Sequence, residues 1–453
     1  MKKFLITTFV VILICFVGLW SVISGGYDRQ NKTILLLKEF IPNKLAKKVR
    51  DIIFIIPDLK EQNKIYKLQV AKYEQGYEGN LFEEIKDKSE DGTYVYSLKK
   101  FFLPFPRLDT RLGWQAKKNS KRAHYLEIVE DQILVISGLG ETIYFDKKNF
   151  YKKKLNQKII NNNIEQILKN KNSELLGIRD LLHDSNYIYI SLVEEEERGA
   201  TINIYRAKKN FKNLTFEIFF ETKEFTEKYS LQTGGRLEKF KDNKILFSIG
   251  FLEKFEKNQK KDNLFGKIIA IDKDTKDYKL ISLGHRNPQG LFYLEENNLI
   301  INTEHGPKGG DEVNLNFLDS EEIKNYGWPI SSYGKPYPQL KEYFEKKGFL
   351  KTTHKENKFK EPLKYFVPSI GISELIFIKE NTQKNLSKRI FVSSLRAHSI
   401  YVLKVDKSFN KVLEVDRIYI PNNRIRDLKY DEENKHFLVI LENVPALGVI
   451  NIN

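Results

Sequence analysis

Arginines recur along the second half of the chain, and they are the residues best suited to binding an anion. Arg424 and Arg426 alternate, so on a strand both side chains would point to one face. Arg236, Arg286 and Arg396 occupy comparable places in other segments. Two arginines on one face are costly to bury unless an anion or acidic side chains pair with them. The pattern therefore indicates either a site for a ligand with several carboxylates or phosphates, or ion pairs between neighbouring segments.

Two polar stretches near these arginines carry further candidates. Residues 284–290 read GHRNPQG, and residues 304–312 read EHGPKGGDE. Each stretch contains a histidine, His285 or His305, that could act as a base. The acidic pair that ends the second stretch could bind a metal or the substrate, but a cap or an ion pair is the expected role. Trp328 is expected to pack at the rim of the site.

The elements that must position these residues follow a repeated pattern of short apolar runs. Six such runs are spaced mostly about 50 residues apart, with further short runs before and after them. The six are 133–137, 187–191, 245–249, 299–302, 390–393 and 437–440. A period of this size with several strands per repeat is typical of a β-propeller, and six repeats predict six blades. The longest interval holds an insertion around residues 326–360, which we expect at the rim of the ring.

The N-terminus predicts a membrane segment. Lys2 and Lys3 precede an apolar run from Phe4 to about Ile23, and roughly 20 apolar residues can span a bilayer as a helix. A cleaved export signal is the alternative. The fold class expected is all-β: a six-bladed propeller at 118–453, preceded by an anchor or signal at 1–25 and a short α+β region at 26–117. This arrangement would place the propeller on the periplasmic or extracytoplasmic side of the cell membrane.

Composition narrows the class of protein. Hydrophobic residues make up 41% and charged residues 30% of the 453 residues, which excludes a disordered chain or a polytopic membrane protein. One Cys excludes an intramolecular disulfide and Cys-rich zinc or iron–sulfur sites. The net charge of +16 is mostly lysine. We interpret it as spread over the surface, and no nucleic-acid partner is expected.

Several ordered motifs resemble the soluble glucose/sorbosone dehydrogenase family. They are GHRNPQGL at 284–291, EHGPKGGDEVNL at 304–315 and NYGWP at 325–329. The resemblance covers roughly residues 120–453. It implies a six-bladed propeller that binds pyrroloquinoline quinone and calcium.

The family's site residues can be carried over by position. Residues implied to contact the quinone are Arg286, Asn287, Ser369, Arg396, Arg424 and Arg426. Arg396 occupies a position where the family has a Lys, and Ser369 one where the family has a Thr. The backbone carbonyls of Gly306 and Pro307 are implied to hold calcium, a hard cation that prefers oxygen ligands.

Two positions depart from the family pattern. The family's general base is the His of a His-x-Gly-Gly-Arg-Leu motif, and here Gln232 stands in its place. An amide cannot take a proton from a substrate hydroxyl, which makes His285 and His305 the nearest alternative bases. His285 matches a family position without a base role and is expected to be structural, whereas His305 could face the ligand. A cofactor-contacting Gln of the family falls at Asn172, whose side chain is shorter.

The resemblance predicts a membrane-anchored, quinone-dependent dehydrogenase that oxidises an aldose or a similar hydroxyl compound. One alternative is a non-catalytic propeller that binds a ligand in the same funnel. Another is a hydrolase that uses the funnel with a metal. The sequence leaves the substrate and the electron acceptor open.

Overall fold

A computed structural model describes residues 82–103, 105, 123–152, 157–227, 230–241, 243–350, 354–379 and 385–452. The expected membrane segment and most of the expected region 26–117 lie outside these residues. Within the described part of the chain, no helix combines the length and the apolar character needed to cross a membrane.

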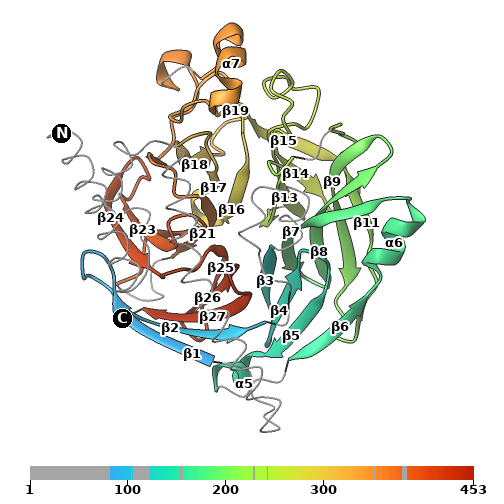
Figure 1. The fold of residues 1–453 in the computed structure, drawn as a ribbon, viewed down its shortest axis with the longest axis vertical. Helices are drawn as coiled ribbons and strands as arrows, with labels where there is room; N and C mark the ends of the chain where they lie inside the picture. The colour runs from blue at the N-terminus through green and yellow to red at the C-terminus, as the bar shows by residue number, and fades with distance from the viewer. Residues whose placement is uncertain are drawn as a thin grey trace, which may run out of the picture.

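Six β-sheets are arranged around a central axis, which confirms the expected propeller. Each sheet has four or five strands, and nearly all neighbouring strands are antiparallel. In Figure 1 the inner strands β3, β7, β16, β21 and β25 surround the centre, and the later strands of each sheet lie farther out. The six apolar runs found in the sequence are the second strands of the six blades.

The strands of each blade follow in order from the inside outward. The first blade consists of β3 (His124–Val129), β4 (Gln132–Ser137), β5 (Thr142–Asp146), β6 (Lys158–Asn162) and β10 (Asn213–Leu214). The second blade consists of β7 (Glu174–Asp184), β8 (Tyr187–Glu196), β9 (Gly199–Lys208) and β11 (Glu217–Glu221). The third blade consists of β12 (Gly234–Phe240), β13 (Lys244–Ile249), β14 (Lys267–Asp272), β15 (Tyr278–Leu283) and β19 (Lys324–Asn325). The fourth blade consists of β16 (Pro288–Leu294), β17 (Leu299–Glu304), β18 (Asp311–Phe317) and β20 (Lys364–Phe366). The fifth blade consists of β21 (Ile372–Ile378), β22 (Arg389–Ser394), β23 (Ser399–Val405) and β24 (Val412–Tyr419). The sixth blade consists of β25 (Ile425–Asp431), β26 (His436–Leu441), β27 (Ala446–Ile452), β2 (Val95–Phe102) and β1 (Phe82–Lys88).

The sixth blade closes the ring with strands from both ends of the described chain. The C-terminal strand β27 pairs with β2 along its whole length, and β1 pairs with β2 at the outer edge. Both N-terminal strands fall within the stretch 26–117, for which we expected a separate region. Their pairing places residues 82–102 in the propeller itself.

The core lies between the blades, because each sheet covers the face of the next. Second strands are covered on both faces, which is why their sequences are continuous runs of Ile, Leu, Val and Phe. Phe391 of the fifth blade meets Phe437 of the sixth with ring centroids 4.8 Å apart, and both rings are fully buried. The blades therefore stabilise each other as one unit.

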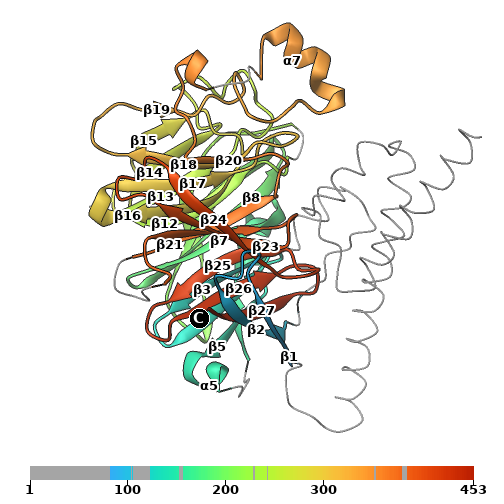
Figure 2. The ribbon, with the colours of Figure 1, turned by 90° about the vertical axis from the view of Figure 1, so that its left-hand side faces the viewer.

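Helices occur only in connections within the described residues. They are α5 (Lys147–Tyr151), α6 (Ile164–Asn170) and α7 (Lys341–Lys347), with single turns η2 (Glu295–Asn297), η3 (Pro338–Leu340) and η4 (Lys355–Asn357). The helix α7 belongs to the expected insertion, and Figure 2 shows it standing away from the sheets. Its Phe344 packs with Trp328 and Phe251 in a small aromatic cluster that joins the insertion to the third blade.

One arginine at the centre of the ring contacts the inner strands of all the other blades. Nη1 of Arg236 lies 2.9 Å from Asp180, 2.9 Å from Glu374 and 3.1 Å from Asp427, which come from β7, β21 and β25. Its Nε donates to the carbonyl of Gln289 on β16. The guanidinium also lies 5.0 Å from the ring of Tyr125 on β3.

For Arg236 the ion-pair interpretation was therefore correct and the ligand interpretation was not. The three carboxylates around it lie close enough together to hold a metal ion, but the guanidinium already occupies the space between them. All three acids are almost completely buried.

We expect Arg236→Met to lower the free energy of unfolding by about 3–5 kcal/mol, because it would leave buried carboxylates without their counter-charge. The control is Arg198→Met, since Arg198 pairs with Glu196 at the surface and its side chain is 66% exposed. That change should cost less than about 1 kcal/mol in urea unfolding. Equal losses in the two variants would contradict a central role for Arg236.

The same cluster predicts a pH dependence of stability. Burial raises the pKa of Glu374 to about 8, although the charge of Arg236 opposes the shift. Because the pKa is higher in the folded state, the folded protein binds more protons, and stability should fall as the pH rises from about 5 to about 8. Urea unfolding of Glu374→Gln should show a shallower fall across this range. An unchanged slope would mean that other groups cause the dependence.

Candidate active site

The propeller topology gathers the candidate residues at one end of the ring. In an antiparallel blade, the loop that enters the inner strand and the loop between the second and third strands lie at the same end. Every candidate belongs to one of these loops, to an adjoining strand end, or to the insertion segment that leads into β21. We call this end the funnel end.

Arg424 and Arg426 share one buried acid. Their Nε atoms donate to the two carboxylate oxygens of Glu442, at 3.1 and 2.5 Å. Arg426 also donates to the side chain of Gln289 at 3.0 Å. Two guanidinium groups on one carboxylate leave a net positive charge, so the pair keeps the capacity to bind an anion. Glu442 is 2% exposed, and sequence reasoning missed it because it is distant in the chain.

Arg286 is the cation whose surroundings point most directly to a ligand. It is 6% exposed, and none of the described carboxylates lies within ion-pair distance of its guanidinium. Its Nη1 donates to the carbonyl of His305 at 2.9 Å, while its buried Nε has no hydrogen-bond partner. The indole of Trp328 lies 5.2 Å from it. Burial lowers the pKa of Arg286, as expected for a charge held out of water without a counter-ion.

Asn287 and Gln232 come together from two neighbouring blades. Oδ1 of Asn287 accepts from the backbone N–H of Gly234 at 3.1 Å, which ties the loop carrying Gln232 to the start of β16. The carbonyl of Gln232 accepts from Leu252, and its buried side-chain Oε1 has no partner in the described part of the chain. A bound hydroxyl group could donate to this oxygen, but the amide cannot remove the proton.

Asp311 holds the turn 305–310, which contains the implied calcium ligands. Its Oδ1 accepts from the N–H of Gly306 at 3.1 Å and lies 3.8 Å from Nδ1 of His305. Its Oδ2 accepts from Gly371 at 2.8 Å, at the start of β21. The expectation that Asp311 caps and pairs is therefore confirmed. The imidazole of His305 is 21% exposed, and its Nε2 bonds to none of the described residues.

The insertion packs directly on this turn. Lys308 and Lys335 exchange backbone hydrogen bonds of 2.9 and 3.0 Å. The hydroxyl of Tyr337 donates to the carbonyl of Pro307 at 3.3 Å. A Cβ at Gly310 would lie 2.3 Å from the nitrogen of Gly334, so only glycine allows this approach.

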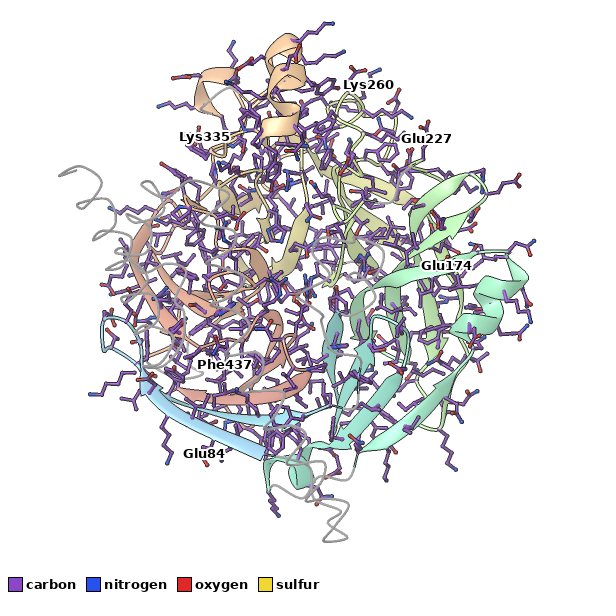
Figure 3. The ribbon with its side chains drawn as sticks, in the orientation of Figure 1. Glu84, Glu174, Glu227, Lys260, Lys335 and Phe437 are labelled. Carbon is purple, nitrogen blue, oxygen red and sulfur yellow. The ribbon has the colours of Figure 1, made fainter. Side chains whose placement is uncertain are left out.

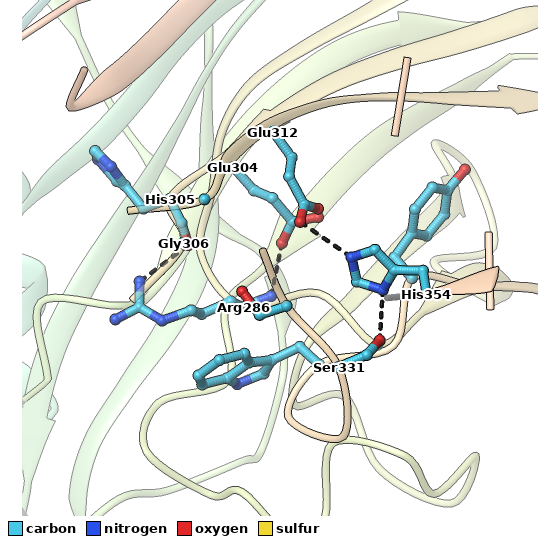
Figure 4. A pocket seen from close by; sticks show the side chains of 12 residues that line it. Arg286, Glu304, His305, Gly306, Glu312, Ser331 and His354 are labelled. Carbon is cyan, nitrogen blue, oxygen red and sulfur yellow. Dashed lines mark hydrogen bonds and ion pairs between the residues drawn. The ribbon is translucent and has the colours of Figure 1, made fainter. Parts of the chain in front are cut away.

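A small, partly open pocket lies between the turn, Arg286 and the insertion. In Figure 4, His354 connects Ser331 to Glu312: Nδ1 lies 2.5 Å from the serine hydroxyl and Nε2 lies 3.1 Å from the carboxylate. Glu304 accepts from the backbone of Arg286 at 2.7 Å. Sequence reasoning missed Ser331 and His354, because both lie in the part of the insertion beyond the NYGWP motif.

The Ser331–His354–Glu312 arrangement has the residue types of a hydrolase triad, but its surroundings favour a structural role. Ser331 is 1% exposed, and its backbone N–H already donates to Gly327 at 3.0 Å. This backbone N–H therefore cannot also donate to the oxyanion that forms during hydrolysis. His285 makes a similar link between Ser282 and Glu304 and is fully buried, in line with the expected structural role.

The remaining candidates lie at the edge of this group. Arg396 is exposed, and its N–H donates to the carbonyl of Ile370 beside β21. Ser369 lies close enough to bond Asp311. Asn172 is exposed in the turn after α6, with a φ of 52°, and its N–H donates to Lys169. No hydrogen bond between described residues joins Asn172 to the other candidates.

Fold and site together define a six-bladed propeller with a group of buried and partly buried arginines at one end. A model of the glucose/sorbosone dehydrogenase family matches residues 130–446. The chain therefore belongs to this family of oxidoreductases.

Individual relatives agree with this assignment. The aldose sugar dehydrogenase YliI of Escherichia coli is 31% identical over 149 residues, which cover 33% of this chain and 37% of that protein. A solved glucose dehydrogenase superposes with a TM-score of 0.59 at 19% identity, covering 73% of this chain and 97% of the other. An aldose sugar dehydrogenase of Streptomyces coelicolor, solved with pyrroloquinoline quinone bound, gives a TM-score of 0.53 at 15% identity, with 79% and 98% covered. The two structural similarities show a common fold.

The difference in ion pairing between Arg286 and Arg426 can be tested without a ligand. We expect Arg286→Met to change the free energy of unfolding by less than about 1 kcal/mol, because the lost hydrogen bond is offset by removal of an unpaired buried charge. Arg426→Met should cost about 1–3 kcal/mol, since it removes one of the two partners of buried Glu442. Urea unfolding measures both. A larger loss for Arg286→Met would assign it a structural role instead.

Proposed function

We propose that the protein is a pyrroloquinoline quinone-dependent dehydrogenase that oxidises an aldose or a similar hydroxyl compound. The observation that carries this proposal is Arg286, a buried guanidinium without an acidic partner among the described residues, in a family whose relatives include sugar dehydrogenases. Arg424 and Arg426 add net positive charge at the same end of the ring. These three arginines, with Asn287, Ser369, Arg396 and Asn172 at the edge, would hold the carboxylates and oxygens of the quinone.

The cofactors fit the donors that the chain provides. The quinone, when bound, supplies the group that accepts hydride from the substrate carbon. Calcium, when bound, supplies Lewis-acid polarisation of an oxygen. The carbonyls of Gly306 and Pro307 would bind calcium, and oxygen donors suit this ion. Asp311 fixes the turn that carries both carbonyls through its bond to Gly306.

His305 is the proposed base. Its Nδ1 faces the carboxylate of Asp311, which leaves Nε2 to take the proton of a substrate hydroxyl. Burial opposes ionisation of Asp311, but hydrogen bonding to His305, Ser369 and backbone N–H groups outweighs it, and the pKa of Asp311 is lowered. An ionised Asp311 would orient the imidazole and stabilise its charged form. Gln232 would contribute a hydrogen bond to the substrate through its unpartnered Oε1.

The anchor proposed for residues 4–23 would hold the propeller at the outer side of the cell membrane. The apolar run in the sequence supports it. Alkaline extraction of membranes is the test, because a spanning helix stays in the pellet and a cleaved signal leaves a soluble product.

The activity is tested on the full chain loaded with pyrroloquinoline quinone and calcium, with dye reduction measured against a panel of aldoses. We expect quinone binding at micromolar concentration and turnover that chelation of calcium reduces. His305→Asn should lower kcat by a factor of about 10²–10⁴, the usual contribution of a positioned base. Gln232→Asn should change kcat by less than about tenfold, the effect of losing one hydrogen bond.

Other results would change the assignment. Binding without turnover, followed by turnover in Gln232→His, would mean that the chain has lost its base and acts as a binding propeller. Absence of quinone binding in the loaded protein would overturn the dehydrogenase proposal.

A further inference from the structure

An exposed apolar patch lies beside the turn 305–310 at the funnel end. Tyr337, Tyr365 and Val367 are 37%, 44% and 60% exposed, although large apolar side chains are mostly buried elsewhere in the described chain. Figure 3 shows the neighbouring Lys335 at the base of the insertion. We call these three residues the apolar patch.

Several contacts show that the patch is continuous with the turn. Tyr337 donates its hydroxyl to the carbonyl of Pro307. Val367 lies 3.6 Å from where a Cβ of Gly309 would be. Tyr365 stacks on Tyr333 with ring centroids 3.8 Å apart. The patch therefore adjoins the carbonyls proposed to hold calcium.

Two exposed cations lie beside the patch. Lys308 and Lys335 lie together through their paired backbones. None of the described acids forms an ion pair with either lysine. An apolar centre with a charged rim is typical of surfaces that bind another protein, and the sign of the rim selects the partner.

We propose that the apolar patch and its two lysines dock a small, acidic, one-electron carrier protein that takes electrons from the reduced cofactor. This inference rests on the proposed function. Oxidation of one sugar breaks a C–H and an O–H bond, forms a C=O bond and releases two electrons and two protons. Two carrier molecules each accept one electron, and the protons pass to water. The position of the patch beside the turn keeps the electron path short.

The rim charges predict how the carrier is selected. The loaded protein should reduce an acidic cytochrome faster than a basic cytochrome of similar size and potential. Raising the ionic strength should lower the rate of reduction of the acidic cytochrome by about tenfold, because salt screens the attraction between opposite charges.

The variant that tests the surface is Lys308→Glu/Lys335→Glu. It should lower kcat/KM for the acidic cytochrome by at least about tenfold, because it reverses two rim charges. Dye reduction and the KM for the sugar should stay within about twofold, since a small neutral dye does not need this surface. The control is Lys407→Glu/Lys411→Glu, which makes the same change of net charge in the exposed loop between β23 and β24, at the opposite end of the ring.

The outcomes separate this inference from the proposed function. Equal losses in test and control variants, or no preference for the acidic cytochrome, would overturn the docking surface while dye reduction still supports the dehydrogenase. A raised KM for the sugar with unchanged cytochrome reduction would assign the patch to the substrate and overturn the inference. Binding of anionic vesicles that the test variant abolishes, without any effect on cytochrome reduction, would assign it to the membrane. Absence of dye reduction in the unmodified loaded protein would overturn both proposals.

Discussion

The guanidinium of Arg236 is the constraint on which the rest of the structure depends. It joins the inner strand of its own blade to those of the other five through three carboxylates, backbone carbonyls and an aromatic ring. A buried charge is stable only when its partners are placed accurately, so this one residue fixes how closely the six inner strands converge. The position and width of the funnel above it follow from that convergence.

The funnel uses the same residue type for a different purpose. Arg426 connects the central Arg236 cluster to the funnel end. Its carbonyl accepts from Arg236, while its guanidinium donates to Glu442 and Gln289. Arg286 lies at the same end of the ring, but none of the described acids lies within ion-pair distance of its guanidinium. Structural arginines and arginines proposed to bind a ligand are therefore distinguished by their neighbours and not by their places in the repeat.

The insertion completes the site by packing against the turn 305–310 from outside the ring. Its backbone pairs with Lys308, and its His354 bonds the carboxylate of Glu312 at the start of β18. Packing of this kind leaves little freedom to the carbonyls of Gly306 and Pro307. The same segment also supplies the exposed Lys335 and Tyr337 beside them, so one insertion would serve both the proposed cofactor site and the proposed docking surface.

The sequence by itself determined the six-bladed ring, because second strands covered on both faces must be continuous apolar runs and recur with the blade period. Its ordered motifs also determined the family. Only the tertiary structure decided that Arg236 is structural, since its partners lie in other blades, and that the guanidinium of Arg286 has no acidic partner among the described residues. It alone brought Glu442, Ser331 and His354 to the site, and joined residues 82–102 to the last blade, because pairing between distant segments leaves no local pattern.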